Sequence, residues 1–362
     1  MKKLLTLAVA ITIGLLAQDA FAYSYKYCGS SGNKIKWGGT SKRLYASTVS
    51  FPAGYWQNGI QDTINITNRN PSRFRYALSM DSGGVGRGNG QSEIWFSSSL
   101  CSPACAYQYY SCYWLFGWRY GMNEVDIVYS TSTSWTASTA KSGLIRYGGT
   151  RRALQSTGVH ELGHGLILNH VNTEYNIMGS DFEHMHANGG TARTYVGEDA
   201  ADGMVALYGN RGGWEDVSVT HWKYSGASGE YSDHTKTVIR NSSGTTLPTV
   251  NVGGETGHRV NRGTWVQAEF TFENNGSTTQ SSVPVGFYIS TNDYISTGDR
   301  RVATRTLTLA RDNVYTSSTW VYIPTDLTPN RSYWLGAIVD YTNSRAEQVE
   351  YNNATYIPMY VQ

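Results

Sequence analysis

Eleven consecutive residues, from His160 to His170, constrain the fold of this chain more than any other stretch of its sequence. They read HELGHGLILNH and contain three histidines and one glutamate. Residues four apart lie on the same face of an α-helix, so His160 and His164 can direct ring nitrogens at one metal ion. His170 completes a set of three nitrogen ligands. Three protein ligands leave the fourth tetrahedral position open to water or substrate, as catalytic zinc sites require.

Glu161 has a different task from the histidines. It lies one residue further round the helix than His160, beside the expected ion but off the axis that a direct ligand needs. From there its carboxylate can take a proton from a water activated by the metal, which is the general-base task in an HExxH motif. A lone HExxH also arises by chance, and a single histidine is more often a surface or core residue than a ligand. The third histidine and the sequence NIMG at Asn176–Gly179 favour a metal site over those alternatives.

These residues together resemble the metzincin metalloproteases, in which HExxHxxGxxH is followed by a methionine turn beneath the metal. The resemblance is strongest to the matrixin-like, secreted bacterial branch, covers about residues 35 to 210, and includes Met178, eight residues beyond His170. It implies an α+β metzincin-like catalytic domain in which His160, His164 and His170 hold one catalytic Zn²⁺ and Glu161 is the catalytic base. Weaker similarities lie at residues 51–56, 92–96 and 123–129, and residues 199–209 resemble the closing helix of that domain.

The chain departs from the metzincin pattern at two positions. Ile167 stands where the family has a glycine, which lets the chain leave the helix sharply because a positive φ costs glycine little. A β-branched residue is poorly suited to that conformation, and Asn169 is the predicted substitute because asparagine tolerates it. His170 is therefore the ligand most in need of a test. Ser180 stands where astacins and serralysins have a tyrosine that acts as an extra ligand or transition-state donor, but matrixins also lack that tyrosine.

Residues 1–22 read as a secretory signal peptide. Lys2 and Lys3 precede an apolar run, and Ala20-Phe21-Ala22 forms a small-x-small cleavage site. That run is too short for a typical membrane span, and no later stretch is longer. The whole chain carries a formal charge of +2 without a basic cluster, which argues against nucleic acid as a partner. We expect a secreted, extracellular monomer whose partners are protein or glycoprotein substrates.

Four cysteines follow the signal peptide: Cys28, Cys101, Cys105 and Cys112. An even number in an oxidising compartment predicts two disulfides, with three connectivities open. In the alternative, Cys28 is a latency thiol that caps the zinc, as in the matrixin cysteine switch. That alternative leaves an odd number of cysteines for disulfides and is less favoured.

Composition and length predict two domains. The chain has 27 tyrosines, 11 tryptophans, 39 glycines and only 15% charged residues, which is typical of β-rich extracellular domains. The sequence YGNRGG at Tyr208–Gly213 reads as a linker. We therefore predict a metzincin-like zinc protease domain at residues 23–212 and a β-sandwich at residues 213–362. The part from about residue 255 resembles the CARDB-type, immunoglobulin-like domains of bacterial surface and secreted proteins, which implies an all-β sandwich. The similarity lies in residues 270–276, 286–292, 335–340 and 350–353.

Periodicity places the main elements. Alternating apolar residues predict strands at 216–220, 266–272 and 285–289, and turn residues follow at 274–276 and 297–299. A further strand is expected at 124–129, and helices at about 56–67 and 154–168. The second helix contains Gly158, Gly163 and Gly165, each of which costs about 1 kcal/mol relative to alanine. We expect packing and metal binding to stabilise this helix, so the metal-free protein should be less stable.

Three other groups of residues are candidate sites. The run Gly83–Gly90 lacks the Lys-Ser/Thr ending of a phosphate-binding loop and reads as a flexible surface loop. His184 and His186 could line the cleft or hold a second metal, although exposed loop histidines are commoner. Asp293 and Asp299 could bind Ca²⁺, although turn residues are the commoner interpretation.

The sequence as a whole favours a secreted zinc endopeptidase that cleaves extracellular proteins with Glu161 as the general base. The alternative is an adhesin or glycan-binding protein in which the zinc is structural and the sandwich binds the ligand. The Tyr- and Trp-rich composition and Ile167 draw attention to that alternative. In either case the C-terminal domain could dock the protein onto a glycoprotein or cell surface. Zinc stoichiometry and chelator-sensitive cleavage of casein separate the two hypotheses.

Overall fold

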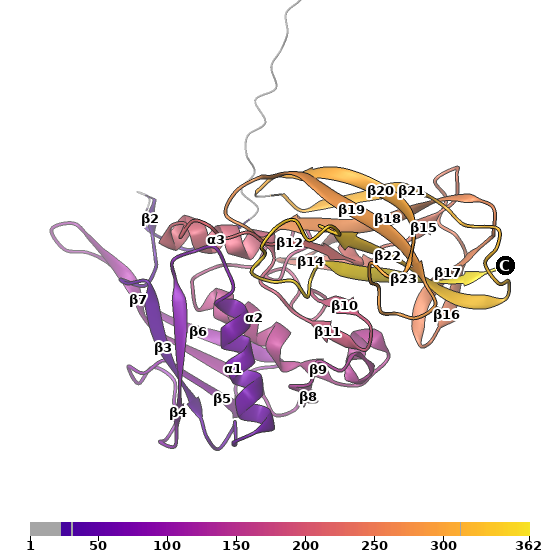
Figure 1. The fold of residues 1–362 in the computed structure, drawn as a ribbon. Coiled ribbons are helices and arrows are strands. Elements are labelled where there is room, and N and C mark those ends of the chain that lie inside the picture. The colour runs from indigo at the N-terminus through magenta and orange to yellow at the C-terminus, as the bar shows by residue number, and fades with distance from the viewer. Residues whose placement is uncertain (1–22, 30–31, 312) are drawn as a thin grey trace, which may run out of the picture.

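The computed structural model describes residues 23–29, 32–311 and 313–362 (Figure 1), and the predicted signal peptide lies outside this range. The described chain is a mixed α and β structure in which strands predominate. Its α-helices are α1 (Tyr55–Thr67), α2 (Leu154–His164) and α3 (Glu198–Tyr208). None of the helices in this part of the chain is long and apolar enough to cross a membrane.

A five-stranded sheet in the order β4-β3-β5-β7-β6 lies beside α1 and α2 (Figure 1). Strands β3, β4, β5 and β7 are parallel, whereas β6 runs antiparallel at the edge. Apolar side chains from the sheet and both helices, such as Leu44, Ile60, Ile127 and Leu162, form one buried cluster. This packing holds the helix of the HExxH motif next to β6. The bounds are β3 (Ser41–Ser47), β4 (Arg75–Asp81), β5 (Glu93–Ser97), β6 (Ala104–Trp114) and β7 (Trp118–Ser130).

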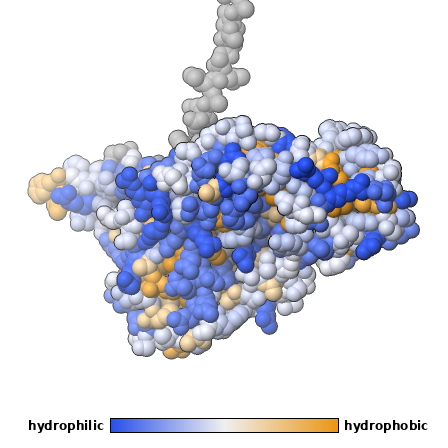
Figure 2. Space-filling model, in the orientation of Figure 1, coloured by the Kyte–Doolittle hydropathy of each residue, from blue (hydrophilic) through white to orange (hydrophobic). Residues whose placement is uncertain are grey.

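Strands β6 and β7 continue beyond the sheet as a long hairpin that projects from the molecule (Figure 1). Its tip exposes Trp114, Leu115 and Phe116, and Phe116 is 97% exposed. The same tip is the orange projection at the left of Figure 2. A disulfide between Cys28 and Cys112 ties this hairpin to β1 (Tyr27–Cys28), which pairs with β2 (Asn33–Lys34).

The prediction of two disulfides is wrong in part. Only Cys28 and Cys112 are joined among the described residues, whereas Cys101 and Cys105 are free thiols that hydrogen-bond to each other. Burial, followed by the contact with Cys105, raises the pKa of Cys101 to about 12, so its thiol is neutral at physiological pH. An even count of cysteines does not reveal this difference, because paired thiols and a disulfide have the same sequence signature. The disulfide also excludes Cys28 as a latency thiol in this structure, and it is consistent with an extracellular location.

Two facing sheets make up most of the C-terminal part (Figure 1). In the first, β18 pairs with β21 and with the short strands β12 and β15. The second has the order β16-β17-β23-β22-β19-β20. Side chains from both sheets, including Phe270, Phe287 and Leu335, share one buried cluster, as in a β-sandwich. The bounds are β12 (Val217–Thr220), β15 (Ile239–Arg240), β16 (Thr249–Val252), β17 (Glu255–Val260), β18 (Trp265–Asn274), β19 (Gln280–Ser290), β20 (Arg300–Leu309), β21 (Tyr315–Tyr322), β22 (Arg331–Val339) and β23 (Ala354–Val361).

The two parts are joined by buried polar contacts and by one hairpin. Lys141, before α2, donates from Nζ to Glu255 Oε1 at 2.8 Å and to Asp293 Oδ2 at 2.6 Å, both in the sandwich. The hairpin of β13 (Trp222–Ser228) and β14 (Tyr231–Lys236) reaches back to the HExxH region. The predicted domain boundary between residues 212 and 213 stays a prediction. The short elements are β8 (Trp135–Thr136), η1 (Lys141–Gly143), η2 (Ile145–Tyr147), β9 (Arg152–Ala153), β10 (His186–Asn188) and β11 (Thr191–Arg193).

Most predicted elements are confirmed to within a few residues. The strands expected at 124–129, 266–272 and 285–289 are parts of β7, β18 and β19, and the expected strand at 216–220 is β12. The helices expected at 56–67 and 199–209 are α1 and α3. The helix of the HExxH motif is four residues shorter than predicted, because it ends at His164 and the chain turns directly afterwards.

Candidate metal centre and its cleft

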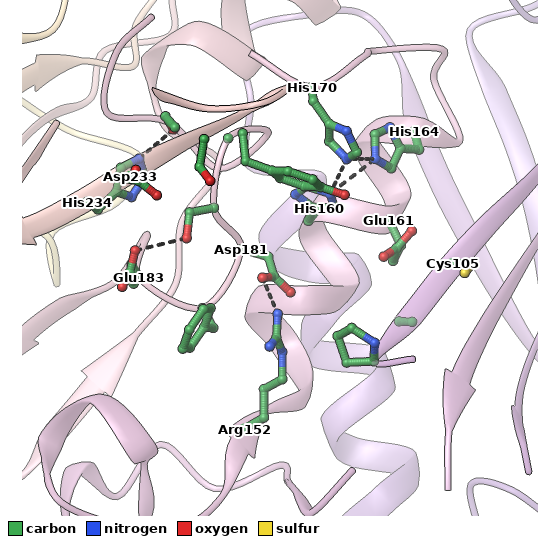
Figure 3. Close-up of a pocket in the computed structure, with 18 of the residues that line it drawn as sticks. Cys105, Arg152, His160, Glu161, His164, His170, Asp181, Glu183, Asp233 and His234 are labelled. Atoms are coloured by element: carbon green, nitrogen blue, oxygen red, sulfur yellow. Dashed lines mark hydrogen bonds and ion pairs between the residues drawn. The ribbon is translucent and has the colours of Figure 1, made fainter. Parts of the chain in front are cut away.

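Three histidine rings converge at the end of α2 (Figure 3). The Nε2 atoms of His160 and His164 are 3.1 Å apart, those of His164 and His170 are 2.9 Å apart, and those of His160 and His170 are 3.3 Å apart. Ligands 2.0–2.1 Å from one tetrahedral zinc lie about 3.3 Å from each other. The three histidines predicted from the sequence therefore form a cluster that could hold a metal ion, and no other group of ligand atoms in the described residues is as compact.

Hydrogen bonds to backbone carbonyl oxygens set the direction of two of these rings. Nδ1 of His160 lies 2.7 Å from the carbonyl oxygen of Ile177, and Nδ1 of His164 lies 2.7 Å from that of Leu168. A carbonyl oxygen can accept a hydrogen bond only from an Nδ1 that carries a proton. In a neutral ring Nε2 then has no proton, and its lone pair is free to bind an ion. Burial, followed by the charges of His160 and His170, pushes the pKa of His164 well below its usual range. Burial also lowers the pKa of His160, so these two rings are neutral nitrogen donors.

The turn that brings back His170 is formed by Ile167, which corrects the prediction that Asn169 replaces the family glycine. Ile167 has a φ of 70° and its side chain is completely buried. The amide of Asn169 instead donates to Ser24, so Asn169 holds the N-terminal segment against the chain after the turn. A left-handed residue that is not glycine costs on the order of 1–2 kcal/mol. Burial of the isoleucine side chain in the core offsets this strain.

Met178 packs against α2 at Gly163, and the carbonyl of the preceding Ile177 contacts His160. The side chain of Met178 is 1% exposed, and a Cβ at position 163 would lie 2.4 Å from its sulfur. Gly158 has a similar constraint, because a Cβ there would lie 2.4 Å from Thr63 Cγ2 and from the Tyr129 hydroxyl. The glycines that weaken α2 as an isolated helix therefore permit its close packing against Met178 and α1.

Glu161 is 6% exposed and points toward the cleft beside the histidines (Figure 3). Burial is the main reason that its pKa rises to about 8, and the charge of Asp181 raises the pKa further. Arg152 and the backbone N–H of Ala106, which donates to the carboxylate, lower the pKa. A carboxylate in this environment is a stronger base than one exposed to water.

A cleft of about 680 Å³ opens over the histidines and Glu161. Residues 102–106, at the start of β6, form one wall, and β6 is the last strand of its sheet. The opposite wall contains the residues after Met178, including Asp181, whose carboxylate is paired with Arg152 (Figure 3). Burial alone would raise the pKa of Asp181, but the charge of Arg152, together with smaller contributions, outweighs burial and the pKa is lowered. Asp181 therefore remains ionised beside the metal centre.

The hairpin of β13 and β14 covers one side of the cleft. The ring of Tyr231 lies 4.2 Å from that of His170, and Oε1 of Glu230 lies 3.3 Å from His170 Nδ1. Burial, then the charges of Glu230 and Glu161, raise the pKa of Tyr231. Its hydroxyl is therefore protonated at physiological pH and lies within the electrostatic reach of Glu161.

Sequence reasoning missed Arg152, Asp181, Glu230 and Tyr231. Asp181 follows the NIMG sequence by two residues. This closeness to the motif was the one sign in the sequence that Asp181 could lie near the histidines. Glu230 and Tyr231 lie 60 or more residues beyond His170 in the part assigned to the sandwich, and no motif marks them.

The other candidate residues lie outside the centre. His184 and His186 are 0% and 3% exposed, so the expectation of exposed loop histidines is wrong, and neither lines the cleft. Asp299 accepts hydrogen bonds from Ser296 within a turn, and Asp293 is paired with Lys141.

The glycine-rich run Gly83–Gly90 has a structural task that the sequence did not reveal. Its backbone N–H groups donate to buried carboxylates, from Gly86 to Glu93, from Gly88 to Asp126 and from Gly90 to Glu124. The backbone of this loop is therefore hydrogen-bonded to carboxylate side chains of the neighbouring sheet.

Comparisons with known proteins give only distant likenesses. No family profile and no curated protein sequence matches the chain. The CARDB domain of the PF1109 protein from Pyrococcus furiosus, solved with di-metal ions, is 17% identical with a TM-score of 0.26, over 41% of this chain and 90% of that chain. OgpA from Akkermansia muciniphila is 10% identical with a TM-score of 0.25, over 89% of this chain and 92% of that chain. At these values neither likeness bears on the activity of this chain, which has to be inferred from its own site.

Proposed function

We propose that this chain is a secreted zinc endopeptidase with a metzincin-like catalytic domain, and that it cleaves peptide bonds of extracellular proteins. One observation carries the proposal: the Nε2 atoms of three histidines lie 2.9–3.3 Å from one another with the buried carboxylate of Glu161 beside them. Three lone pairs at this separation repel each other unless a cation lies between them, so the donor set fits Zn²⁺. When bound, Zn²⁺ polarises the scissile carbonyl and lowers the pKa of a water molecule to about 7.

Glu161 would be the general base and later the general acid. Its raised pKa of about 8 favours uptake of a proton from the attacking water. The same proton can then pass to the nitrogen of the leaving amine, which restores the carboxylate. The N–H of Ala106 and the charge of Arg152 limit this rise, because both lower the pKa of Glu161.

An extended substrate would lie along β6. The edge strand of a sheet presents main-chain N–H and C=O groups to which a peptide can add as a further strand. Residues 102–106 of this edge line the cleft opposite the histidines. This arrangement would place the scissile peptide bond between β6 and the metal centre. The substrate side chain on the C-terminal side of that bond would point toward Asp181 and Phe182.

Tyr231 would donate a hydrogen bond to the oxyanion that forms at the scissile carbonyl. In astacins and serralysins a tyrosine near the methionine turn is expected in that place, whereas this chain has Ser180 there. Tyr231 reaches the same centre from the β13–β14 hairpin, and its neutral hydroxyl is a donor.

The catalytic assignment is tested with Glu161→Gln and His164→Ala. We expect Glu161→Gln to retain one zinc per chain but to cleave casein at least about a hundredfold more slowly, because the general base is lost. His164→Ala should lose the zinc as well. Metal content by mass spectrometry and chelator-sensitive cleavage are the measurements. Cleavage by Glu161→Gln at the wild-type rate, or one zinc per chain in His164→Ala, would contradict the assignment.

The assignment of Tyr231 is tested with Tyr231→Phe. This change keeps the ring against His170 but removes the donor, so we expect kcat to fall about a hundredfold with little change in KM and zinc content. Tyr294→Phe, at an exposed tyrosine of the sandwich, is the matched control. An equal loss in both variants, or a change confined to KM, would argue against a transition-state role.

A further inference from the structure

The end of the β6–β7 hairpin gathers exposed apolar side chains (Figure 2). Six large hydrophobic residues between positions 110 and 120 are exposed, whereas no other stretch of that length in the described chain exposes more than two. They are Tyr110, Tyr113, Trp114, Leu115, Phe116 and Tyr120. Soluble proteins rarely expose an apolar patch of this kind unless it binds a partner. We call residues 110–120 the aromatic tip.

The aromatic tip is a stiff, preformed projection. Strands β6 and β7 stay paired as far as Trp114 and Trp118, and beyond this pair the N–H of Leu115 donates to the carbonyl of Gly117 at 2.9 Å. The disulfide of Cys112 fixes the hairpin to β1 close to the turn. A projection that is already ordered loses little conformational entropy when it binds.

Phe116 is the most exposed of these side chains, and its backbone is strained. The side chain is 97% exposed, and φ is 49°, in the left-handed region that favours glycine. Ile167 has a similar strain, but burial in the core offsets it, whereas Phe116 has no such compensation. Strain that the fold does not offset is found mainly where it serves a function. The hairpin therefore holds a phenyl ring outward at its end.

The side chains of the aromatic tip change in polarity with distance from the turn. Residues 115–116 form the turn, and the rings of Trp114 and Trp118 follow, with centroids 5.8 Å apart. The next pair back is Tyr113 with Arg119. A lipid interface has the same order, in which apolar chains give way to a layer that suits Trp and Tyr and then to charged headgroups. A pocket in another protein imposes no such order.

The chain around the aromatic tip carries positive charge without acidic neighbours in sequence. Residues 23–61 and 94–123, which include β1, β2 and the outer part of the hairpin, contain no Asp or Glu. Beside the hairpin, Lys26, Lys34 and Lys36 donate from Nζ to amide and carbonyl oxygens at 2.6–3.2 Å. None of these lysines belongs to an ion pair of the described residues. Their charge complements an anionic surface.

We propose that the aromatic tip inserts into the surface of an anionic lipid bilayer and holds the protein there. The turn at residues 115–116 would reach the boundary of the acyl chains, and the indole and phenol rings would lie among the headgroups. At the aromatic tip β6 and β7 pair only with each other, so the outer main-chain groups of this ribbon need water and would stay in the hydrated layer. Arg119 and the three lysines would contact lipid phosphates.

Membrane binding through the aromatic tip would leave the cleft open. Ala106 at the cleft and Trp114 at the tip lie on the same strand, and a rise of about 3.3 Å per residue places them roughly 25 Å apart. The cleft would therefore face the medium next to the membrane. The proposal does not rest on the zinc assignment, because the aromatic tip shares no residue with the cleft.

Vesicle flotation with the full mature chain tests the proposal. The vesicles contain phosphatidylcholine alone or with a quarter phosphatidylglycerol. We expect the wild type to float with the anionic vesicles and to bind the neutral vesicles several-fold more weakly. Phe116→Ser should weaken binding to the anionic vesicles at least about tenfold, because burial of the phenyl ring is lost. Arg119→Gln should weaken it about fivefold and leave binding to neutral vesicles unchanged.

Two further measurements separate insertion from unfolding and from surface attraction. Phe116→Ser should keep the Tm of the wild type, because the exposed ring contacts little of the protein. Lipids with brominated acyl chains should quench the tryptophan fluorescence of the bound wild type, and should quench that of Trp114→Phe less. Trp320→Phe, at an exposed tryptophan of the sandwich, is the matched control and should be quenched as strongly as the wild type.

Three outcomes would overturn the proposal. The first is the absence of flotation with both kinds of vesicle. The second is equal binding of the wild type and Phe116→Ser, which would show that the lysines alone attract the vesicles. The third is a dimer in sedimentation velocity that Phe116→Ser abolishes, without vesicle binding, which would identify the aromatic tip as an interface between copies of this chain. Glu161→Gln should float as the wild type does, so failure of the proposed protease function is distinguishable from failure of this proposal.

Discussion

At the scale of single residues, the site depends on buried groups whose charge state is set by their surroundings. His164 is held neutral by burial and by its two neighbouring histidines, whereas burial makes Glu161 a stronger base. Spacing alone predicted these residues, because a helix fixes which side chains share a face. Arg152, Asp181 and Tyr231 were not predictable in this way. They reach the cleft from separate elements, and only tertiary packing brings them together.

His186 should make the protein sensitive to acid. Burial lowers its pKa to about 4 in the folded state, from about 6.5 in an unfolded chain. Because the folded protein binds this proton more weakly than the unfolded chain, the neutral form of His186 favours the fold. Its contribution to stability is complete above pH 6.5 and is lost as the pH falls toward 4. By pH 5 the loss is about 2 kcal/mol.

Urea unfolding of the wild type and of His186→Gln at pH 7 and pH 5 measures this contribution. The free energy of unfolding of the variant should fall by about 2 kcal/mol less than that of the wild type over this interval. An identical decrease in both proteins would show that His186 is not responsible.

At the scale of elements, α2 is short, has no side-chain cap at its N-terminus, and contains glycines where neighbouring elements touch it. The sequence predicted the helix but not its end at His164, because the residue that turns the chain is an isoleucine rather than a glycine. Ile167 adopts a conformation that its type disfavours, and the surrounding core holds it there. Local propensity therefore pointed to the wrong residue for the turn, although the turn itself and the return of His170 agree with the motif.

Gly163→Ala should disturb the packing of α2 on the methionine turn. The added Cβ would lie 2.4 Å from the sulfur of Met178, so this side chain must move away from α2. We expect a loss of about 1–3 kcal/mol in the free energy of unfolding and weaker zinc retention. Chemical denaturation and competition with a zinc chelator are the measurements.

Gly143→Ala is the control, because a Cβ at Gly143 meets no atom within 4 Å. Equal stability and zinc retention in the two variants would show that Met178 adapts without cost.

At the scale of the whole molecule, the chain has two large apolar cores, but its site belongs to both parts. Alternation of apolar residues predicted the strands of the sandwich, since one face of each is buried in the second core. No periodicity predicted that β13 and β14 would leave the sandwich and cover the metal centre. Hairpins of this kind are directed by contacts with distant residues, such as Glu230 with His170.

We expect the two parts to unfold together. Buried contacts cross between them at Lys141 with Glu255, at Asp202 with Arg311, and at Tyr195 with Glu273. Separation would leave these charged and polar groups without partners, so neither part should be stable alone. Differential scanning calorimetry should give one transition with a calorimetric enthalpy close to the van't Hoff enthalpy. Two resolved transitions, or a folded fragment of residues 23–212, would contradict this expectation.

The histidines and the residues that border the entrance of the cleft lie on different elements, because the latter belong to the β13–β14 hairpin. The ligands of the centre lie on α2 and the turn after it, whereas Glu230 and Tyr231 stand at the end of a ribbon encoded more than fifty residues later. Exchange or lengthening of that ribbon's tip would reshape the entrance while the histidine geometry stayed in place. Related chains are thus free to acquire new substrate preferences through changes in a single turn.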